Sequence, residues 1–203
     1  MIVAVNFSSS EITDKHLEYI GGLSNLESLF LYRTKINGTG LVHLRSLKRL
    51  KHLSLMRTEV NDSGIQHLKQ LRNLKTLRLS NTNITNAALK TIEGLTNLEL
   101  LTLSDTKITD EGLERIKKLI MLKRLRLTGT QVTEAGLVHL APLKRLEELW
   151  LDNTRIGDGG LKYLVRLRKL KRLWIGGTQI TAEGIQLLNA ALPSCEIKSS
   201  NSK

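Results

Sequence analysis

The sequence predicts an α/β solenoid, a stack of similar coils with a parallel β-sheet on one side and short helices on the other. The first observation is a period of 24 residues. Seven leucines each open a copy of the repeated unit: Leu23, Leu47, Leu71, Leu95, Leu119, Leu143 and Leu167. Within the copy at 95–118, Leu101 and Leu103 have the spacing of a half-buried strand, and Leu113 and Ile116 have that of a helix. Because one unit has no core of its own, the copies must stack.

Two further columns of the repeat mark its turns. One column is threonine in every full copy: Thr34, Thr58, Thr82, Thr106, Thr130, Thr154 and Thr178. We expect each hydroxyl to satisfy backbone groups of its own and neighbouring coils. The other column is glycine at six places, Gly40, Gly64, Gly112, Gly136, Gly160 and Gly184, and is broken only by Ala88 and His16. We interpret it as a place where a side chain would push the helix off the strand layer.

The start of the helix in the copy at 95–118 is marked by a threonine that is followed by an acid. Thr109 has the character of an N-cap, and Asp110 places a negative charge in the first turn, where unpaired N–H groups lie. The helical part of each copy is only about two turns long, so we expect some of these helices to be partly 3₁₀.

The motif L-x-x-L-x-L-x-x-T-x-I-T-D-x-G-L, written out in 98–113, resembles leucine-rich repeats. Threonine stands where most members of that family have Asn or Cys, and the T-x-I-T-D-x-G-L tail is similar to the cysteine-containing and bacterial variants. The resemblance covers about residues 3–197. It implies a right-handed, horseshoe-shaped solenoid with the parallel sheet on the concave face and short helices on the convex face. It also implies that the concave face binds other proteins.

The repeat predicts one domain over 1–198. It comprises a partial first repeat at 1–22, seven full repeats at 23–190 and a closing strand at 191–198, followed by a frayed tail at 199–203. Val3, Val5 and Phe7 keep the phase of the repeat, so the chain starts in mid-unit with an unpaired strand edge. We therefore expect either a fragment of a longer protein or a covered edge, and either a monomer or an oligomer that forms through that edge.

Composition favours a cytoplasmic setting. The 203 residues contain one cysteine, Cys195, so the chain cannot form the disulfide-bonded caps of secreted relatives. The N-terminus lacks the pattern of a signal peptide, and no apolar run is long enough to span a membrane. Glycosylation of the four sequons would reverse this prediction, but an Asn- and Thr-rich repeat generates sequons by chance. They start at Asn6, Asn37, Asn61 and Asn83.

Function is expected in the variable positions on the exposed face of the sheet, where two clusters stand out. The first, near the N-terminal end, contains Phe30, Tyr32 and Met56. The second, near the C-terminal end, contains Arg124, Arg126, Glu148, Trp150, Asp152, Arg172 and Trp174. Trp and Arg are enriched at binding hot spots, and a solvated sheet face has no need of large aromatics. The alternative is that the rings stack on each other and on Arg126 and stabilise the sheet.

Basic residues gather where each helix turns back to a strand. This basic edge contains sixteen Lys or Arg and only four acids, Glu27, Glu93, Glu99 and Glu147, so it accounts for the net charge of +12. The bases are Arg45, Lys48, Arg49, Lys51, Lys69, Arg72, Lys75, Lys117, Lys118, Lys123, Lys144, Arg145, Arg166, Arg168, Lys169 and Lys171. Cations also complement helix C-termini, and no aromatic side chain interleaves them to stack on bases. Weak, salt-sensitive adhesion is therefore favoured over specific nucleic-acid binding.

The sequence offers no catalytic or cofactor site. Cys195 lies at the expected frayed end without a neighbouring histidine, and no thiolate completes a metal site around His43 and His67, which we interpret as a solvated pair. Glu148 and Asp152 are surrounded by arginines, which favours ion pairing over acid–base chemistry.

We therefore predict a non-catalytic protein-interaction scaffold without a cofactor. The alternatives are a module that binds polyanions, nucleic acid or an anionic surface through the basic edge, and the substrate-recognition arm of a larger ligase or effector.

Overall fold

The computed structural model describes residues 2–199, which form nine parallel strands in one open sheet. The strands lie in chain order, and each pairs with the next at an offset of 24 residues, as Leu77 pairs with Leu101. They are β1 (Ala4–Asn6), β2 (Ser28–Phe30), β3 (His52–Ser54), β4 (Thr76–Arg78), β5 (Leu100–Thr102), β6 (Arg124–Arg126), β7 (Glu148–Trp150), β8 (Arg172–Trp174) and β9 (Glu196–Lys198). The predicted fold class is confirmed.

The second layer consists of short helices, and several are wholly or partly 3₁₀, as expected for segments of about two turns. They are η1 (Asp14–His16), α1 (Leu17–Gly21), η2 (Thr39–Ser46), α2 (Asp62–Ile65), η3 (Gln66–Gln70), α3 (Asn86–Ile92), α4 (Asp110–Ile116), η4 (Glu134–Leu140), η5 (Asp158–Gly160), α5 (Leu161–Leu164) and α6 (Ala182–Ala191). Among residues 2–199, none of these helices is long and apolar enough to cross a bilayer.

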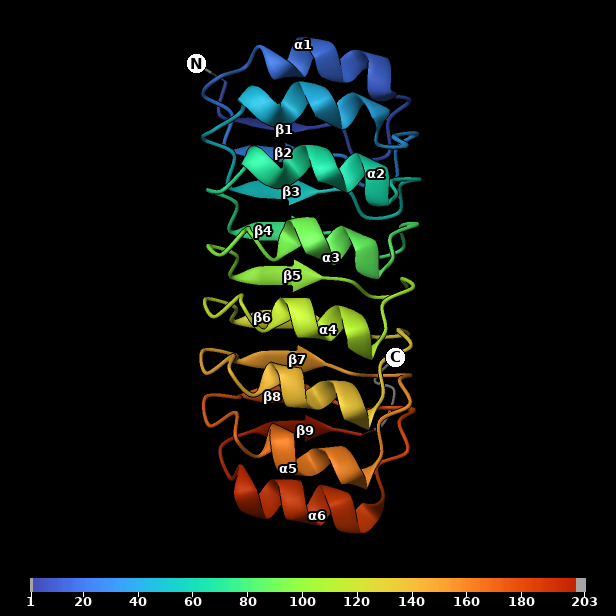
Figure 1. Ribbon diagram of the computed structural model, residues 1–203, viewed down its shortest axis with the longest axis vertical. Helices are drawn as coiled ribbons and strands as arrows, with labels where there is room; N and C mark the ends of the chain where they lie inside the picture. Colours follow the sequence, from blue (N-terminus) through green and yellow to red (C-terminus); the bar gives the residue numbers. More distant parts are fainter. Residues whose placement is uncertain (1, 200–203) are drawn as a thin grey trace.

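The solenoid curves with its sheet on the inner side. In Figure 1 the row of helices reaches beyond the row of strands at both ends, with α1 above β1 and α6 below β9. The strands therefore lie on the shorter, concave side, and the face of the sheet turned away from the helices is the inner surface of the curve.

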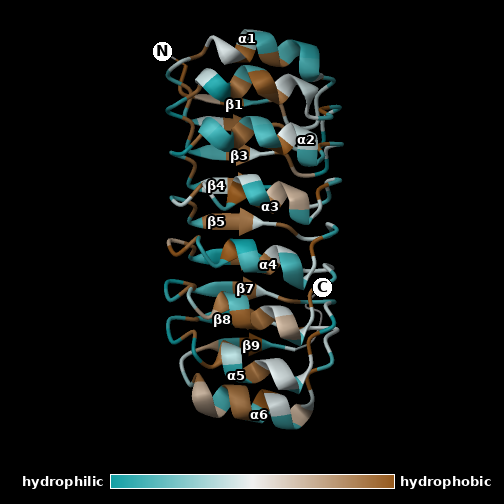
Figure 2. Cartoon of the chain, in the orientation of Figure 1, coloured by the Kyte–Doolittle hydropathy of each residue, from teal (hydrophilic) through white to brown (hydrophobic). Residues whose placement is uncertain are grey.

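The core lies between the two layers and is built from the leucine columns. The central residue of each strand from β2 to β8, such as Leu77 or Leu125, is fully buried. Burying one such side chain stabilises the fold by roughly 1.5–3 kcal/mol. Figure 2 shows β5 as hydrophobic along its length, whereas β3 and β7 are coloured largely as hydrophilic. The cause is Leu100, which is apolar at a position where the neighbouring strands carry polar residues.

The threonine column is confirmed as a ladder, but its bonds stay within each coil. The Thr106 hydroxyl donates to the carbonyl oxygen of Leu103 at 2.5 Å, and the other members of the column bond in the same way to the residue three positions earlier. The expected bonds to neighbouring coils are made by an acidic column instead. Asp62, for example, accepts from the Thr85 backbone N–H at 2.8 Å and from the Thr85 hydroxyl at 2.7 Å.

This acidic column also corrects the explanation of the glycines. A Cβ atom on Gly136 would lie 2.3 Å from Oδ1 of Asp110, and one on Gly184 would lie 2.2 Å from Oδ1 of Asp158. At these two positions glycine is therefore required by the carboxylate of the preceding coil, and at Gly40 and Gly64 by its backbone, rather than by the strand layer. The N-cap expectation is also wrong for Thr109, whose side chain makes no capping bond, whereas Thr85 and Thr133 do cap their helices.

A further repeated feature, a left-handed residue just after each strand, was not predicted. Seven residues spaced by 24 have positive φ: Arg33, Arg57, Asn81, Asp105, Gly129, Asn153 and Gly177. This conformation costs most residues roughly 1–2 kcal/mol. Glycine adopts it at almost no cost, and Asn and Asp adopt it at a reduced cost. Five of the seven are of those types, and this pattern is the signal in the sequence that would have indicated the turn.

The described C-terminal segment is ordered up to β9, which pairs with β8. Cys195 is buried, with 8% of its surface exposed, so the expectation that it lies in a frayed end is wrong. Of the tail predicted at 199–203, residues 200–203 lie outside the described residues.

Candidate binding face on the sheet

The exposed face of the sheet presents the residues on either side of each central leucine. In β7, Glu148 and Trp150 are half-buried while Leu149 between them is fully buried, because side chains alternate along a strand. The same alternation in all the strands places both predicted clusters on this surface, which we call the sheet face.

The second cluster is organised by a stack of three side chains. The rings of Trp150 and Trp174 lie 4.1 Å apart between centroids with an interplanar angle of 9°. The Arg126 guanidinium carbon lies 4.2 Å from the Trp150 ring centroid, and Lys198 Nζ lies 5.6 Å from that of Trp174. The tryptophans are half-buried rather than standing free in solvent, because each ring covers part of the next.

The remaining members of this cluster have separate roles. Glu148 pairs with Arg172 across β7 and β8, and not with Arg124 or Arg126. Asp152 faces no arginine: its Oδ1 accepts from the Gly176 backbone N–H at 2.9 Å, and its Oδ2 lies 3.5 Å from the Thr128 hydroxyl. The expectation that arginines neutralise both acids is therefore correct for Glu148 and wrong for Asp152, whose carboxylate holds the adjoining turn.

The first cluster lies together as predicted. Phe30, Tyr32 and Met56 line one hollow of about 490 Å³, together with Arg78 and small polar residues of β1 and β3. Arg57 adds a cation above Tyr32, with its guanidinium carbon 5.9 Å from the ring centroid. An apolar hollow rimmed by polar groups is a typical protein-binding feature.

Between the two clusters lies a smaller hollow that the sequence interpretation missed. Its volume is about 160 Å³, and its lining residues are Met56, Arg78, Leu100, Thr102, Arg124 and Arg126. Met56 and Arg78 line both hollows, so the two predicted clusters form one continuous surface. The available signal was the pair of arginines at the same position of β4 and β6, on either side of the small Thr102.

Electrostatics in this middle hollow are unbalanced. The pKa of the Arg126 guanidinium is lowered, first by burial and then by repulsion from Arg78 and Arg124, while Glu148 acts in the opposite sense. Because Glu148 is already paired with Arg172, positive charge is in excess in the hollow.

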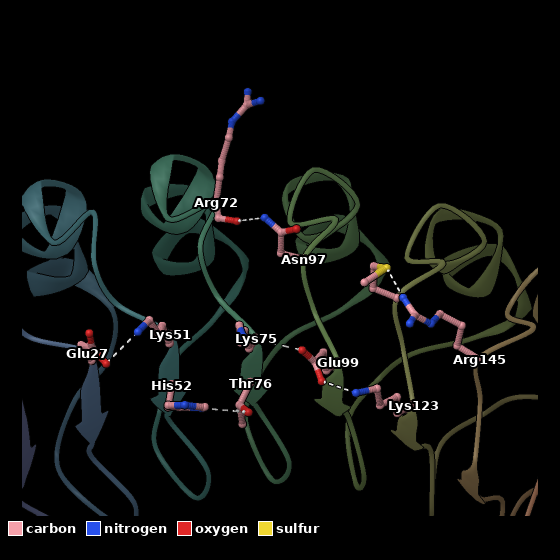
Figure 3. A network of polar contacts seen from close by, with 11 residues as sticks. Glu27, Lys51, His52, Arg72, Lys75, Thr76, Asn97, Glu99, Lys123 and Arg145 are labelled. Atoms are coloured by element: carbon pink, nitrogen blue, oxygen red, sulfur yellow. Dashed lines mark hydrogen bonds and ion pairs between the residues drawn. The ribbon is translucent and has the colours of Figure 1, made fainter.

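The basic edge is partly neutralised by a ladder of ion pairs that runs from coil to coil (Figure 3). Lys51 Nζ lies 2.8 Å from a Glu27 carboxylate oxygen, Lys123 Nζ lies 2.8 Å from one of Glu99, and Lys75 Nζ lies 3.9 Å from the other Glu99 oxygen. In all, six of the sixteen bases pair with carboxylates. Arg72, in contrast, extends away from the ribbon, and only its carbonyl accepts a bond, from Asn97.

The candidates for catalysis or metal binding have other environments. Burial, and then the charge of Glu196, raises the pKa of the Cys195 thiol to about 11, so this group is not a thiolate near neutral pH. His67 is not part of a solvated histidine pair: its Nδ1 bonds to Nη2 of Arg45 at 2.6 Å, and burial followed by Arg45 lowers its pKa. Within residues 2–199, three or more metal-ligating side chains do not cluster anywhere.

Comparisons place this architecture among known proteins. A family model described as "Leucine Rich repeat" matches residues 70–92 and 94–117. No curated protein matches the sequence.

Solved structures match nearly the whole chain. The internalin inlF of Listeria monocytogenes is 23% identical with a TM-score of 0.79, over 98% of this chain and 54% of that one, so this chain spans about half of its length. Internalin C2 of the same species is 26% identical with a TM-score of 0.79, over 97% and 81% of the two chains. The ectodomain of the Arabidopsis thaliana receptor kinase GASSHO1/SCHENGEN3, in complex with CASPARIAN STRIP INTEGRITY FACTOR 2, is 16% identical with a TM-score of 0.66, over 98% and 24%.

Proposed function

Because the chain is a leucine-rich repeat protein, we propose that it is a non-catalytic module that binds another protein on its sheet face. Leucine-rich repeat proteins are typically protein-interaction domains, and the plant receptor ectodomain was solved with CASPARIAN STRIP INTEGRITY FACTOR 2 bound. The fold supplies a rigid inner surface, and the variable residues on it set the specificity.

The observation that carries the proposal is the stack of Arg126, Trp150 and Trp174. Stacking fixes the two rings before any partner arrives, so little side-chain entropy is lost on binding. Exposed ring edges and a guanidinium are the groups that most often dominate binding energy. A purely structural role would account for about 0.5–1.5 kcal/mol per aromatic contact, and the test below separates the two roles.

The basic edge supports the alternative, polyanion binding, less well. Its ion-pair ladder turns part of the positive charge inward to glutamates of adjacent coils. Salt distinguishes the two surfaces: binding through the basic edge should weaken by orders of magnitude between about 50 and 200 mM salt, whereas an aromatic hot spot should largely survive. A role as the recognition arm of a larger enzyme is compatible with both surfaces. The cytoplasmic setting and the oligomeric state stay predictions.

The test begins with the capture and identification of a protein partner from the native organism. The purified partner is then titrated against variants of this chain to measure the Kd. Changing Trp150 and Trp174 to Ser should raise the Kd at least about tenfold. The matched control changes two exposed apolar residues of the helix side, Val138 on η4 and Leu187 on α6, to Ser. Both variants are checked for folding by circular dichroism and thermal unfolding.

Three readouts decide between the roles. Weaker binding in the tryptophan variant alone, with folding retained, supports the proposal. Retained binding together with a large fall in Tm would show that the stack is structural. Loss of binding in Arg72→Gln and Lys69→Gln, with the tryptophan variant unaffected, would move the function to the basic edge.

A further inference from the structure

We propose that the middle hollow of the sheet face is an anion site that receives one acidic side chain of the protein partner, either a carboxylate or a phosphorylated residue. This inference rests on the proposed protein-binding function and adds to it the chemistry that the partner must present. The hollow is the one of about 160 Å³ that β4, β5 and β6 form with Met56.

Three arginines line this hollow from two strands that are not adjacent. Arg78 comes from β4, Arg124 and Arg126 come from β6, and β5 lies between them with shorter side chains. Among residues 2–199, none of the three forms an ion pair, because the nearby Glu148 is held by Arg172. Guanidinium donors are planar and suited to bidentate contact with carboxylate or phosphate oxygens.

A second observation, independent of the arginines, points to a missing polar group. Thr102 lines the hollow with 4% of its surface exposed, and its hydroxyl oxygen has no hydrogen-bond partner within the described residues. A buried hydroxyl without a partner costs roughly 1–3 kcal/mol, so such groups are normally satisfied. The other buried threonines, in the turn column, all bond to a carbonyl oxygen. An oxyanion bound among the arginines would provide the acceptor that Thr102 lacks.

The surroundings strengthen attraction for an anion. Leu100, 7% exposed, and Met56 form apolar walls that exclude water, which makes charge–charge contacts stronger than at an open surface. Arg126 stacks its face on Trp150, and stacking leaves the in-plane N–H donors available. Mutual repulsion among the three arginines is relieved when a negative charge enters.

The shape favours a single side chain over a nucleic acid. The hollow has room for one small anionic group, and its lining includes the apolar Met56 and Leu100, whereas a nucleic-acid strand needs a basic groove that follows successive phosphates. The tryptophan stack beside it offers contact area for the residues that flank such a side chain in a folded or extended partner.

The first experiment uses the isolated chain, so it does not depend on the partner. Inorganic phosphate and acetate are titrated at constant ionic strength against chloride, followed by thermal unfolding and by the NMR signals of arginine side chains. The test variant is Arg78→Gln with Arg124→Gln, which leaves Arg126 and the tryptophan stack intact. The matched control is Arg72→Gln with Arg166→Gln on the basic edge, which removes the same charge.

We expect phosphate, acetate or both to raise the Tm of the native chain and of the control variant. The anion that does so should leave the Tm of the test variant unchanged. Affinity should fall at least about tenfold in the test variant, and by less in Thr102→Val. Protection by phosphate alone assigns a phosphorylated side chain, and protection by acetate alone assigns a carboxylate. Equal losses in the test and control variants, or no protection beyond chloride, would overturn the anion site.

The second experiment separates this inference from the proposed function. The arginine variant Arg78→Gln/Arg124→Gln should bind the purified partner more weakly than the native chain does. Neutralising the acidic residue of the partner should likewise weaken its binding to the native chain. The same change in the partner should cause no further loss of binding to the arginine variant. If Trp150→Ser/Trp174→Ser abolishes binding while the arginine variant binds normally, the inference fails and the proposed function stands. If single-stranded nucleic acid competes with phosphate for the hollow and no acidic peptide does, the assignment to a protein side chain is wrong.

Discussion

Asp110 of one coil holds Thr133 of the next through two hydrogen bonds to one carboxylate. The Thr133 backbone N–H donates to Oδ1 at 2.8 Å, and the Thr133 hydroxyl donates to Oδ2 at 2.6 Å. Asp62 and Thr85, and Asp158 and Thr181, are related in the same way. These bonds join the starts of neighbouring helices, so the T-D motif of the repeat stabilises the interface between coils.

Removing this carboxylate should destabilise the solenoid. Asp110→Ala deletes two charge-assisted bonds and leaves the Thr133 donors to water, and we expect a loss of about 2 kcal/mol in the free energy of unfolding. Glu111→Ala, an exposed neighbour in the same first turn, is the control and should change stability by less than about 0.5 kcal/mol. Equal losses in urea unfolding would show that the acid acts only through the helix dipole.

Gly136→Ala should be destabilising because its methyl group would lie 2.3 Å from Asp110 Oδ1, which is held by Thr133. We expect a cost of roughly 1–3 kcal/mol. In the background of Asp110→Ala the same change should cost less, since only Leu113 Cδ1, at 3.1 Å, remains close to the new methyl group, so a double-mutant cycle should show coupling. Gly94→Ala is the control, because its nearest neighbour would be 3.5 Å away, and it should be neutral or slightly stabilising. Additive costs would contradict this explanation of the glycine column.

Arg33→Gly is expected to stabilise the protein. Arg33 has a φ of 54°, a conformation that costs an L-residue roughly 1–2 kcal/mol and costs glycine almost nothing. After the greater chain entropy of glycine in the unfolded state is subtracted, we expect a gain of up to about 1 kcal/mol, measured as a higher urea midpoint. Arg155→Gly, at an exposed position with ordinary φ, should lower that midpoint, and a gain there of the same size would refute the role of the backbone angle.

The ion-pair ladder should make stability depend on pH through Glu99. The pKa of the Glu99 carboxyl is lowered, chiefly because Lys123 donates a hydrogen bond to it. A carboxyl whose folded pKa is depressed contributes stability that is present above its unfolded pKa and is lost as pH falls through the folded value. Native protein should therefore melt at a higher temperature than Glu99→Gln at pH 7, and the difference should shrink below about pH 4. Glu183→Gln, on α6, is the control, and a difference that does not depend on pH would contradict the prediction.

Much of the sheet face followed from the sequence, and the hollow between its clusters did not. The 24-residue period fixed which residues share a column, so it predicted that Trp150 and Trp174 would be neighbours. It did not predict that Arg78 and Arg126, on either side of Thr102, would line one hollow together with Arg124. These arginines come from strands two coils apart, and long side chains reach a common space over such a distance only when the intervening residues are short. Asp152 shows the same limit of the repeat period. The period predicted that Asp152 would lie among arginines, but the geometry of the adjoining turn brings its carboxylate to the Gly176 backbone N–H.

The sequence by itself determined the coil, its strand and helix segments, the leucine core and which residues share the exposed face of the sheet, because each depends on a local period that every copy repeats. The tertiary structure decided which polar groups meet between coils: Asp110 with Thr133, Lys123 with Glu99, and the three arginines around Thr102. Those contacts depend on the stacking offset and on side-chain rotamers, and both are set only once neighbouring coils pack together.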